Sequence, residues 1–286
     1  MSLSPEQART WARAQAARAA LLELAALVER ETLLMPLKGI ELVFRYGVPA
    51  TERPMLDFDA LVAPRTFDRV IPILEASGYR MLSSNYSTKV MLAPGAFVPV
   101  DVHRMVLPPM MGRWERGRLF RRGELRSDVY GARMIHARPA DFFVVVAAHC
   151  LKDRLPPARA PGAQRDLLAV AAATSPAAVV ASAEDARLRL TSWLVLTWLE
   201  RQLGGDAPLS AFRRALEPPR AARLRGERVV ARVERWRESH RETAYALARS
   251  NTDEAWRGVL SAGLSLARAG RDTWRRVRAW GEAERT

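Results

Sequence analysis

The spacing of hydrophobic positions near the start of the chain predicts an amphipathic helix. Leu21, Leu24 and Val28 recur every three or four residues, which places them on one helical face. Ser4 precedes Pro5 and is followed three residues later by Gln7, the pattern of a serine N-cap with a capping box and a proline in the first turn. We therefore expect a helix from the first residues to about residue 30.

The next region alternates short apolar runs with turn residues, which is typical of strands and helices in succession. Helices are expected at 40–46 and 64–77, closed by Gly47 and Gly78. Strands are expected at 33–37, 56–62, 79–82, 89–92 and 98–106. These elements predict a small mixed β-sheet with flanking helices, in a domain that covers 1–138.

Strand signals nearly vanish from about residue 139 onward. Apolar residues with helical spacing predict helices at 141–151, 165–173, 190–204 and 253–267, and a proline-rich loop at 155–161. Tryptophans on these helices are expected in the core: Trp193, Trp198, Trp256 and Trp274. The predicted fold class is α+β, with a mixed sheet and flanking helices in 1–138 followed by an all-α domain in 139–286.

The composition is that of a packed globular protein. The chain has 286 residues, of which 49% are hydrophobic. No apolar run approaches the roughly 18 residues that a membrane span needs, and the start lacks the basic and apolar regions of a secretion signal. Cys150 is the single cysteine, which excludes an internal disulfide and a cysteine zinc cluster. We expect a cytoplasmic protein without a membrane partner.

A formal net charge of +14 is compatible with a polyanionic partner. Only three lysines occur, and the arginines are interleaved with acidic residues, which favours a solvated arginine-rich surface over a nucleic-acid interface. The densest run contains Arg113, Arg116, Arg118, Arg121 and Arg122, with Glu115 and Glu124 among them. A solvated face and a channel for a triphosphate or acceptor are the two interpretations of this run.

Three carboxylates carry the best functional signal. Asp57 and Asp59 are two residues apart in an expected strand, so their side chains should point to one face. Two such charges are costly unless a cation lies between them, and oxygen ligands suit Mg²⁺ or Mn²⁺. Asp101 on a later strand would complete a site for two metals about 4 Å apart, as used for displacement at phosphorus. A polar strand edge or helix-capping acids are the alternative.

Two histidines lie near these signals. His103 is on the same strand face as Asp101 and could orient a ligand or a water, accept the acceptor's proton, or pack as a hydrogen-bonded strand histidine. His149 and Cys150 are adjacent on a helix and diverge by about 100°, so we expect a core or interface histidine and a buried cysteine. Asp166 is expected to pair with His149 or Arg165.

An ordered series of motifs resembles a family of uncharacterised nucleotidyltransferase-like proteins with the fold of the DNA polymerase beta-type nucleotidyltransferases. The series covers about 30–106, and weaker similarity extends to His149 and 165–167. Its members are Leu37-Lys38-Gly39, Tyr46, Arg53, Asp57-Phe58-Asp59, Gly78-Tyr79 and Val100-Asp101-Val102-His103.

The resemblance implies roles for these residues. Asp57, Asp59 and Asp101 would be the ligands of two Mg²⁺ ions, and Asp101 would also help to activate the attacking hydroxyl. The turn at Lys38-Gly39 would receive the triphosphate, with Lys38 supplying a charge where related enzymes have a serine hydroxyl. Gly39 permits close backbone approach. Arg53 would brace the carboxylates or contact phosphate.

The expected function is Mg²⁺-dependent transfer of a nucleoside monophosphate from a nucleoside triphosphate to an unknown acceptor, with release of pyrophosphate. The acceptor could be a small molecule, a protein side chain or an RNA end. Because no serine follows Gly39, a catalytically inactive nucleotide-sensing or partner-binding protein is one alternative. A basic nucleic-acid-binding protein is another.

Overall fold

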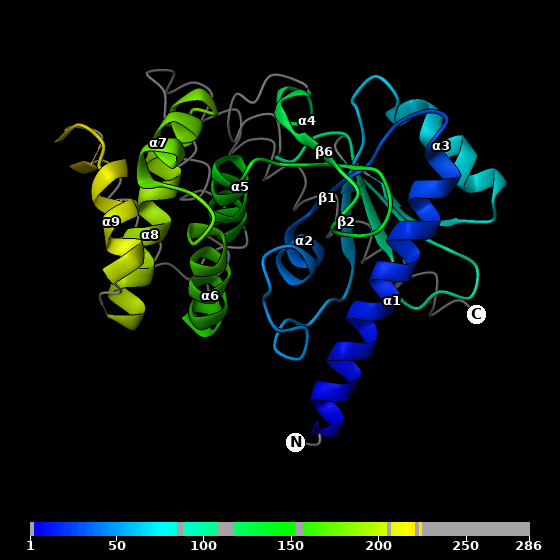
Figure 1. The fold of residues 1–286 in the computed structure, drawn as a ribbon, viewed down its shortest axis with the longest axis horizontal. Coiled ribbons are helices and arrows are strands. Elements are labelled where there is room, and N and C mark those ends of the chain that lie inside the picture. Colours follow the sequence, from blue (N-terminus) through cyan, green and yellow to red (C-terminus); the bar gives the residue numbers. More distant parts are fainter. Residues whose placement is uncertain are drawn as a thin grey trace, which may run out of the picture.

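A computed structural model describes residues 3–84, 88–107, 117–152, 157–204, 207–220 and 223–224. The part of the chain before residue 139 contains two sheets and the helices around them (Figure 1). In chain order these elements are α1 (Pro5–Val28), β1 (Met35–Leu37), α2 (Lys38–Phe44), β2 (Phe58–Leu61), α3 (Phe67–Ala76), β3 (Arg80–Ser84), β4 (Thr88–Leu92), β5 (Val100–His103), α4 (Arg118–Arg122), β6 (Glu124–Arg126) and β7 (Met134–His136).

The main sheet is mixed and has five strands in the order β1-β2-β5-β4-β3. Strands β2 and β5 are parallel, whereas every other neighbouring pair is antiparallel. The parallel pair is central, and the chain joins β2 to β5 through α3 and the β3–β4 hairpin. This topology confirms the predicted mixed sheet with flanking helices.

The two faces of the sheet belong to two different hydrophobic clusters. Phe58 and Ala60 of β2 point to a cluster that also contains residues of α1 and α3. Leu61, the next residue of β2, belongs with Leu37 of β1 to a cluster shared with the helices that follow residue 139. Helices α1 and α3 thus lie on one side of the sheet, and α2 and α5 on the other (Figure 1). Alternation along β2 sends odd-numbered residues toward the helical half.

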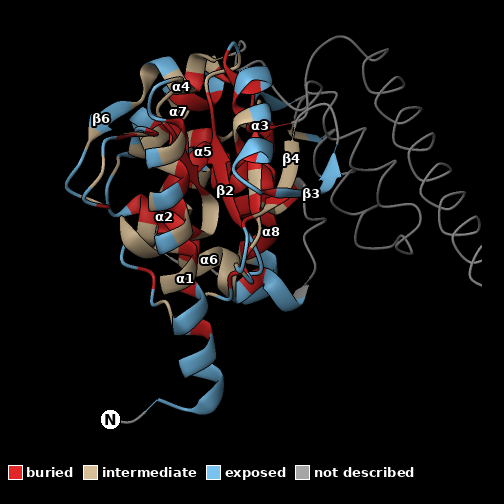
Figure 2. Ribbon diagram, turned by 90° about the vertical axis from the view of Figure 1, so that its right-hand side faces the viewer, coloured by how far each residue is buried: buried red, intermediate tan, exposed pale blue. Residues whose placement is uncertain are grey.

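The described residues after 139 form helices only, in agreement with the predicted helical half. They are α5 (Pro139–Lys152), the 3₁₀ turn η1 (Pro157–Arg159), α6 (Ala160–Ala171), α7 (Pro176–Asp185), α8 (Arg189–Leu203) and α9 (Ala207–Leu216). Trp193 and Trp198 are buried on α8, as predicted. Helix α5 and strand β2 form the buried centre of the molecule (Figure 2). One cluster joins this half to β1 and β2, and the domain boundary near 138 stays a prediction.

Several predicted helices and strands are confirmed, although some begin or end at other residues than predicted. Helix α1 begins with the expected capping box, in which Ser4 Oγ accepts from the backbone of Gln7 and the Gln7 side chain accepts from the backbone of Ser4. Helix α2 begins two residues earlier than predicted, directly at Lys38. Strand β2 begins at Phe58 instead of Leu56, because its first ladder bond runs from Phe58 N to Pro99 O. The expected strand over 98–106 is shorter, Val100–His103.

Other elements were not predicted from the sequence. The β6–β7 hairpin and helix α4 are short, and their apolar residues are too few to produce a clear period. Helices α7 and α9 have ten residues each, and α9 has a helical apolar spacing at Leu209, Phe212 and Leu216 that the sequence analysis missed. The predicted helix at 253–267, Trp256, Trp274, Arg113 and Arg116 lie outside the described residues. Among the described helices, none is long and apolar enough to cross a bilayer by itself, and α6 and α7 pass that test only as a pair bent by 106°.

Candidate active site

The centre of the candidate site is a pair of aspartates on the two parallel strands. Asp59 of β2 is in direct register with Asp101 of β5. Both therefore point to the same face of the sheet, the face that α2 covers. Asp59 is buried, with 4% of its surface exposed, whereas the Asp101 side chain is 20% exposed. The pair thus lies at the border between the protein interior and solvent.

His103 joins this pair from the end of β5. It lies two residues after Asp101 and opposite Leu61, so the two-residue rule predicted its face correctly. Its Nε2 atom is 2.7 Å from Asp59 Oδ1 and 4.0 Å from Asp101 Oδ2. The ring is buried, and its Nδ1 atom has no hydrogen-bond partner within the described part of the chain. His103 is therefore both a packed strand histidine and a direct neighbour of the carboxylates.

Lys38 supplies the positive charge of the site. It is the first residue of α2, directly after β1, and its φ of +54° lies in the left-handed region that few non-glycine residues adopt. Leu37 pairs with Asp59 across β1 and β2, and Lys38 Nζ donates a hydrogen bond to Asp59 Oδ1. A backbone conformation of this kind costs about 1–3 kcal/mol and often occurs at functional sites. Here it accompanies a buried ion pair.

Opposing effects determine the charge state of Asp59 and Lys38. Burial favours the neutral form of Asp59, but the Lys38 charge and the hydrogen bond with His103 hold its pKa well below the usual range. Burial likewise opposes the charge on Lys38, but Asp59, with Asp101 and Asp57 further away, raises the pKa of Lys38 above its ordinary value. The two groups therefore form a charged pair at neutral pH.

Asp57 does not lie where the sequence predicted. It precedes β2 in a bend and is exposed, so the prediction that Asp57 and Asp59 belong to the same strand is wrong. The reason is that the ladder with β5 begins at Phe58, which leaves Asp57 outside the regular pleat. It is still close enough to interact: partial removal of the carboxylate from water and, after it, the charges of Asp59 and Asp101 raise the pKa of Asp57.

The donor atoms fit a divalent cation. One ligand atom each from Asp59, Asp101 and His103 lies within 4.8 Å of the other two. The charges of Asp59 and Asp101 contribute, after desolvation, to the raised pKa of Asp57, and a bound cation would relieve this repulsion. Two carboxylates and an imidazole suit Mn²⁺, and carboxylates with water suit Mg²⁺. The assignment of Asp57, Asp59 and Asp101 as ligands stays a prediction.

Gly39 and Arg53 lie together beside this cluster. A Cβ atom built on Gly39 would lie 3.6 Å from Met55 Cγ and 4.0 Å from Arg53 Nη2, so the space next to this backbone borders a guanidinium. The Arg53 side chain is 30% exposed, and its Nε atom is 3.2 Å from Asp166 Oδ2 of α6. Its one ion pair among the described residues is therefore with the helical half, and the predicted bracing of the site carboxylates is not observed.

Other residues from the sequence analysis have structural partners. Arg118 and Arg122 form ion pairs with Asp185, and Arg122 also lies 3.2 Å from Asp141, so these two arginines join α4 to α5 and α7. Both arginines are partly exposed ion-pair partners, and the two interpretations of the arginine run stay predictions. His149 is buried as expected, but Cys150 is only half-buried.

A second buried polar network supports α2, and the sequence analysis missed it. Glu41 is fully buried and accepts hydrogen bonds from Arg45 Nη1 at 2.9 Å and Tyr130 Oη at 3.2 Å. His136 Nδ1 of β7 is 2.8 Å from Glu41 Oε1. The available signal was an acidic residue within the otherwise apolar run Ile40–Phe44. This network holds in place the helix that begins at Lys38.

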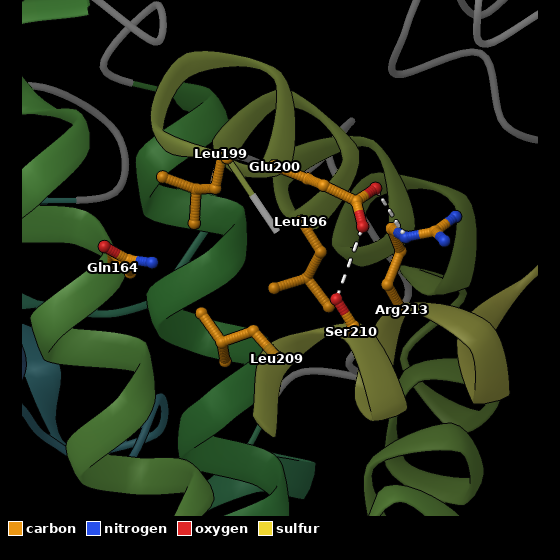
Figure 3. A pocket seen from close by; sticks show the side chains of 8 residues that line it. Gln164, Leu196, Leu199, Glu200, Leu209, Ser210 and Arg213 are labelled. Atoms are coloured by element: carbon orange, nitrogen blue, oxygen red, sulfur yellow. Dashed lines mark hydrogen bonds and ion pairs between the residues drawn. The ribbon is translucent and has the colours of Figure 1, made fainter. Parts of the chain in front are cut away.

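A small pocket lies far from these residues, between α6, α8 and α9 (Figure 3). Its charged groups face each other: Ser210 Oγ donates to Glu200 Oε1 at 3.3 Å, and Arg213 Nε forms an ion pair with Glu200 Oε2 at 2.9 Å. The remaining walls are mainly leucine side chains. The chemistry of the chain is therefore concentrated at the sheet.

Comparison with known protein families agrees with the geometry. The profile of a family described as an uncharacterised nucleotidyltransferase matches residues 1–202. The match covers both the sheet that carries Asp59 and Asp101 and helices α5 to α8 up to Gln202. No curated protein matches the chain.

Proposed function

Because the chain belongs to the family of uncharacterised nucleotidyltransferases, we propose that it transfers a nucleoside monophosphate from a nucleoside triphosphate to an acceptor and releases pyrophosphate. The acceptor is a small molecule, a protein side chain or an RNA end. The observation that carries this proposal is the register of Asp59 with Asp101, which places two carboxylates and His103 around one point.

Each residue has a role that its position supports. Asp59 and Asp101 would hold Mg²⁺ or Mn²⁺ together with Asp57, which extends from the bend before β2. When bound, such a cation would stabilise the negative charge that develops on the leaving pyrophosphate. Asp101 is more exposed than Asp59 and would help to activate the acceptor hydroxyl. His103 orients Asp59 through the 2.7 Å contact.

The phosphate groups would lie against the start of α2. Gly39 has no side chain there, and Arg53 Nη2 borders the same space. Lys38 is on the carboxylate side, bonded to Asp59, so Arg53 is the cation better placed for phosphate in this conformation. Arginine suits that role because its planar fork presents several donors at once.

The test compares the wild-type protein with the double variant Asp57→Asn/Asp59→Asn. Each nucleoside triphosphate, labelled at the α-phosphate, is incubated with Mg²⁺ or Mn²⁺ and with separate pools of RNA, protein and small molecules. We expect metal-dependent labelling of one pool together with pyrophosphate release, and loss of both in the double variant. Circular dichroism and thermal unfolding verify that the variant is folded.

Asp68→Asn is the matched control. Asp68 is an exposed carboxylate on α3 that pairs with Arg104, outside the site cluster. This variant should label the acceptor at the wild-type rate. Unchanged labelling in Asp57→Asn/Asp59→Asn would reject the assignment of the active site.

A second candidate function is nucleotide binding without transfer. It is favoured by the residue after Gly39: Ile40 is fully buried, so the phosphate turn presents no hydroxyl at that position. Titration of the wild-type protein with each triphosphate and Mg²⁺ would then show binding, but no pool would release pyrophosphate. Nucleic-acid binding has less support, because several arginines of the described surface are paired with Asp or Glu.

A further inference from the structure

A double ion pair connects the helical half to the edge of the candidate phosphate site. Two consecutive residues of the turn before β2, Glu52 and Arg53, meet two consecutive residues of α6, Arg165 and Asp166. Arg165 Nη1 donates to Glu52 Oε2 at 3.1 Å, and Arg53 Nε lies 3.2 Å from Asp166 Oδ2. The charges alternate in sign on both sides.

The two pairs differ in environment. The Glu52 side chain is 54% exposed, so its pair with Arg165 is a surface contact of small energy. Asp166 is buried, with 5% of its surface exposed; its Oδ1 atom makes no hydrogen bond among the described residues but lies 3.8 Å from Arg165 Nη2. A buried carboxylate is costly unless it is paired, and Arg53 and Arg165 are the cations that offset this cost for Asp166.

Arg53 is held through one edge of its guanidinium. The Nε atom faces Asp166, whereas Nη2 lies 4.0 Å from the position of a Cβ atom built on Gly39. The contact with Asp166 fixes the long Arg53 side chain, and the Nη2 atom stays in position to bind a ligand. A fixed arginine loses less rotamer entropy on binding phosphate than a free one.

We propose that Asp166 is a positioning residue that holds Arg53 for the triphosphate, so that the helical half contributes to nucleotide affinity at the sheet. The inference rests on the proposed function, because it assumes that phosphate groups lie at Gly39. Asp166 touches no phosphate itself and acts through Arg53.

The test is isothermal titration of the full chain with inorganic tripolyphosphate in the presence of Mg²⁺, a probe without base or ribose. We expect Asp166→Asn to weaken binding on the order of tenfold, comparable to the loss of other groups that orient a ligand-binding residue. Arg53→Gln should weaken binding at least as much. The double variant should be no weaker than Arg53→Gln, because Asp166 has no effect without Arg53.

Two further variants separate positioning from a general structural effect. Glu52→Gln breaks the neighbouring ion pair and should leave the affinity within about twofold, since exposed pairs contribute little. Asp166→Glu keeps the charge and should bind better than Asp166→Asn. Thermal unfolding of each variant shows whether the protein is folded. If Asp166→Asn is unstable, Arg53→Gln removes the same ion pair by changing its more exposed partner.

Three results would overturn the inference. Unchanged affinity in Asp166→Asn would mean that the pair is only structural. Tighter binding would mean that Asp166 competes with phosphate for Arg53. Losses that add in the double variant would mean that the two residues act separately. Absence of tripolyphosphate binding by the wild type would instead contradict the proposed function, on which this inference depends.

Discussion

Asp59 and Asp101 lie directly opposite each other on parallel strands, although 42 positions separate them in the chain (101 − 59 = 42). Parallel register places their side chains on one face at neighbouring positions, whereas a shift of one residue would send one of them into the cluster beneath α1 and α3. The site therefore depends on the pairing of β2 with β5 as much as on the residues themselves.

Asp101→Asn should abolish most of the transfer activity and leave the fold intact. The asparagine keeps the size of the half-exposed side chain but removes a charge from the metal cluster. We expect turnover to fall at least about 100-fold, the usual loss when one electrostatic contributor to a transition state is removed. Pyrophosphate release under saturating nucleotide measures this effect, and a loss below about threefold would exclude Asp101 from the site.

Gly39→Ala should separate nucleotide binding from stability. The new methyl group would be in ordinary contact with Met55, at 3.6 Å, and the backbone of Gly39 is not left-handed. Helix α2 should therefore gain up to about 1 kcal/mol. The same methyl group would occupy the surface where phosphate approaches, so triphosphate affinity should fall. Calorimetric titration and thermal unfolding test both effects, and unchanged affinity would place the phosphates elsewhere.

Lys38→Met should make the stability of the protein depend more on divalent cations. Without the ammonium group, Asp59 keeps only His103 as a close partner, and the free energy of unfolding should fall by about 1–3 kcal/mol. Binding of Mg²⁺ at 100 times its dissociation constant would raise the free energy of unfolding by about 2.7 kcal/mol. The melting temperature of Lys38→Met should therefore rise more with Mg²⁺ than that of Lys38→Arg. Equal rises in the two variants would show that Lys38 does not neutralise the cluster.

The pH dependence of stability should reflect Asp59. Its pKa is well below the ordinary value of 3.8 in the folded protein, so the unfolded chain takes up a proton first as pH falls. Its stabilising contribution is complete above about pH 3.8 and is lost below that value. In chelator, the difference in unfolding free energy between the wild type and Asp59→Asn should shrink from pH 5 to pH 3. A constant difference would contradict the lowered pKa.

Gly123→Ala should destabilise the protein because there is no room for a methyl group at this position. A Cβ atom there would lie 2.3 Å from Ile135 Cγ2 and 3.0 Å from the His136 carbonyl oxygen, so the β7 backbone would have to shift. We expect a loss of about 1–3 kcal/mol in urea unfolding. Gly162→Ala in α6 is the control, since its nearest atom is 3.9 Å away, and it should be neutral or stabilising.

Local patterns in the sequence were sufficient for most of the elements and for the identity of the polar residues. The capping box of α1, the apolar period of α5 and α8, and the alternation along β2 and β5 are set by neighbours within a few positions. The same alternation placed Asp101 and His103 on one strand face. Short elements such as β6 and α4 offered too few residues for a period.

Only the tertiary structure decided which of these residues meet. The start of the β2 ladder at Phe58 left Asp57 outside the strand, although its sequence spacing suited a shared face. The partners of Lys38 and of Arg53 are 21 and 113 positions away (59 − 38 = 21; 166 − 53 = 113). Periodicity describes which side of an element is buried, whereas a contact between two charged side chains depends on how separate elements pack. For that reason the sequence determined the chemistry available to this protein, and the fold determined its geometry.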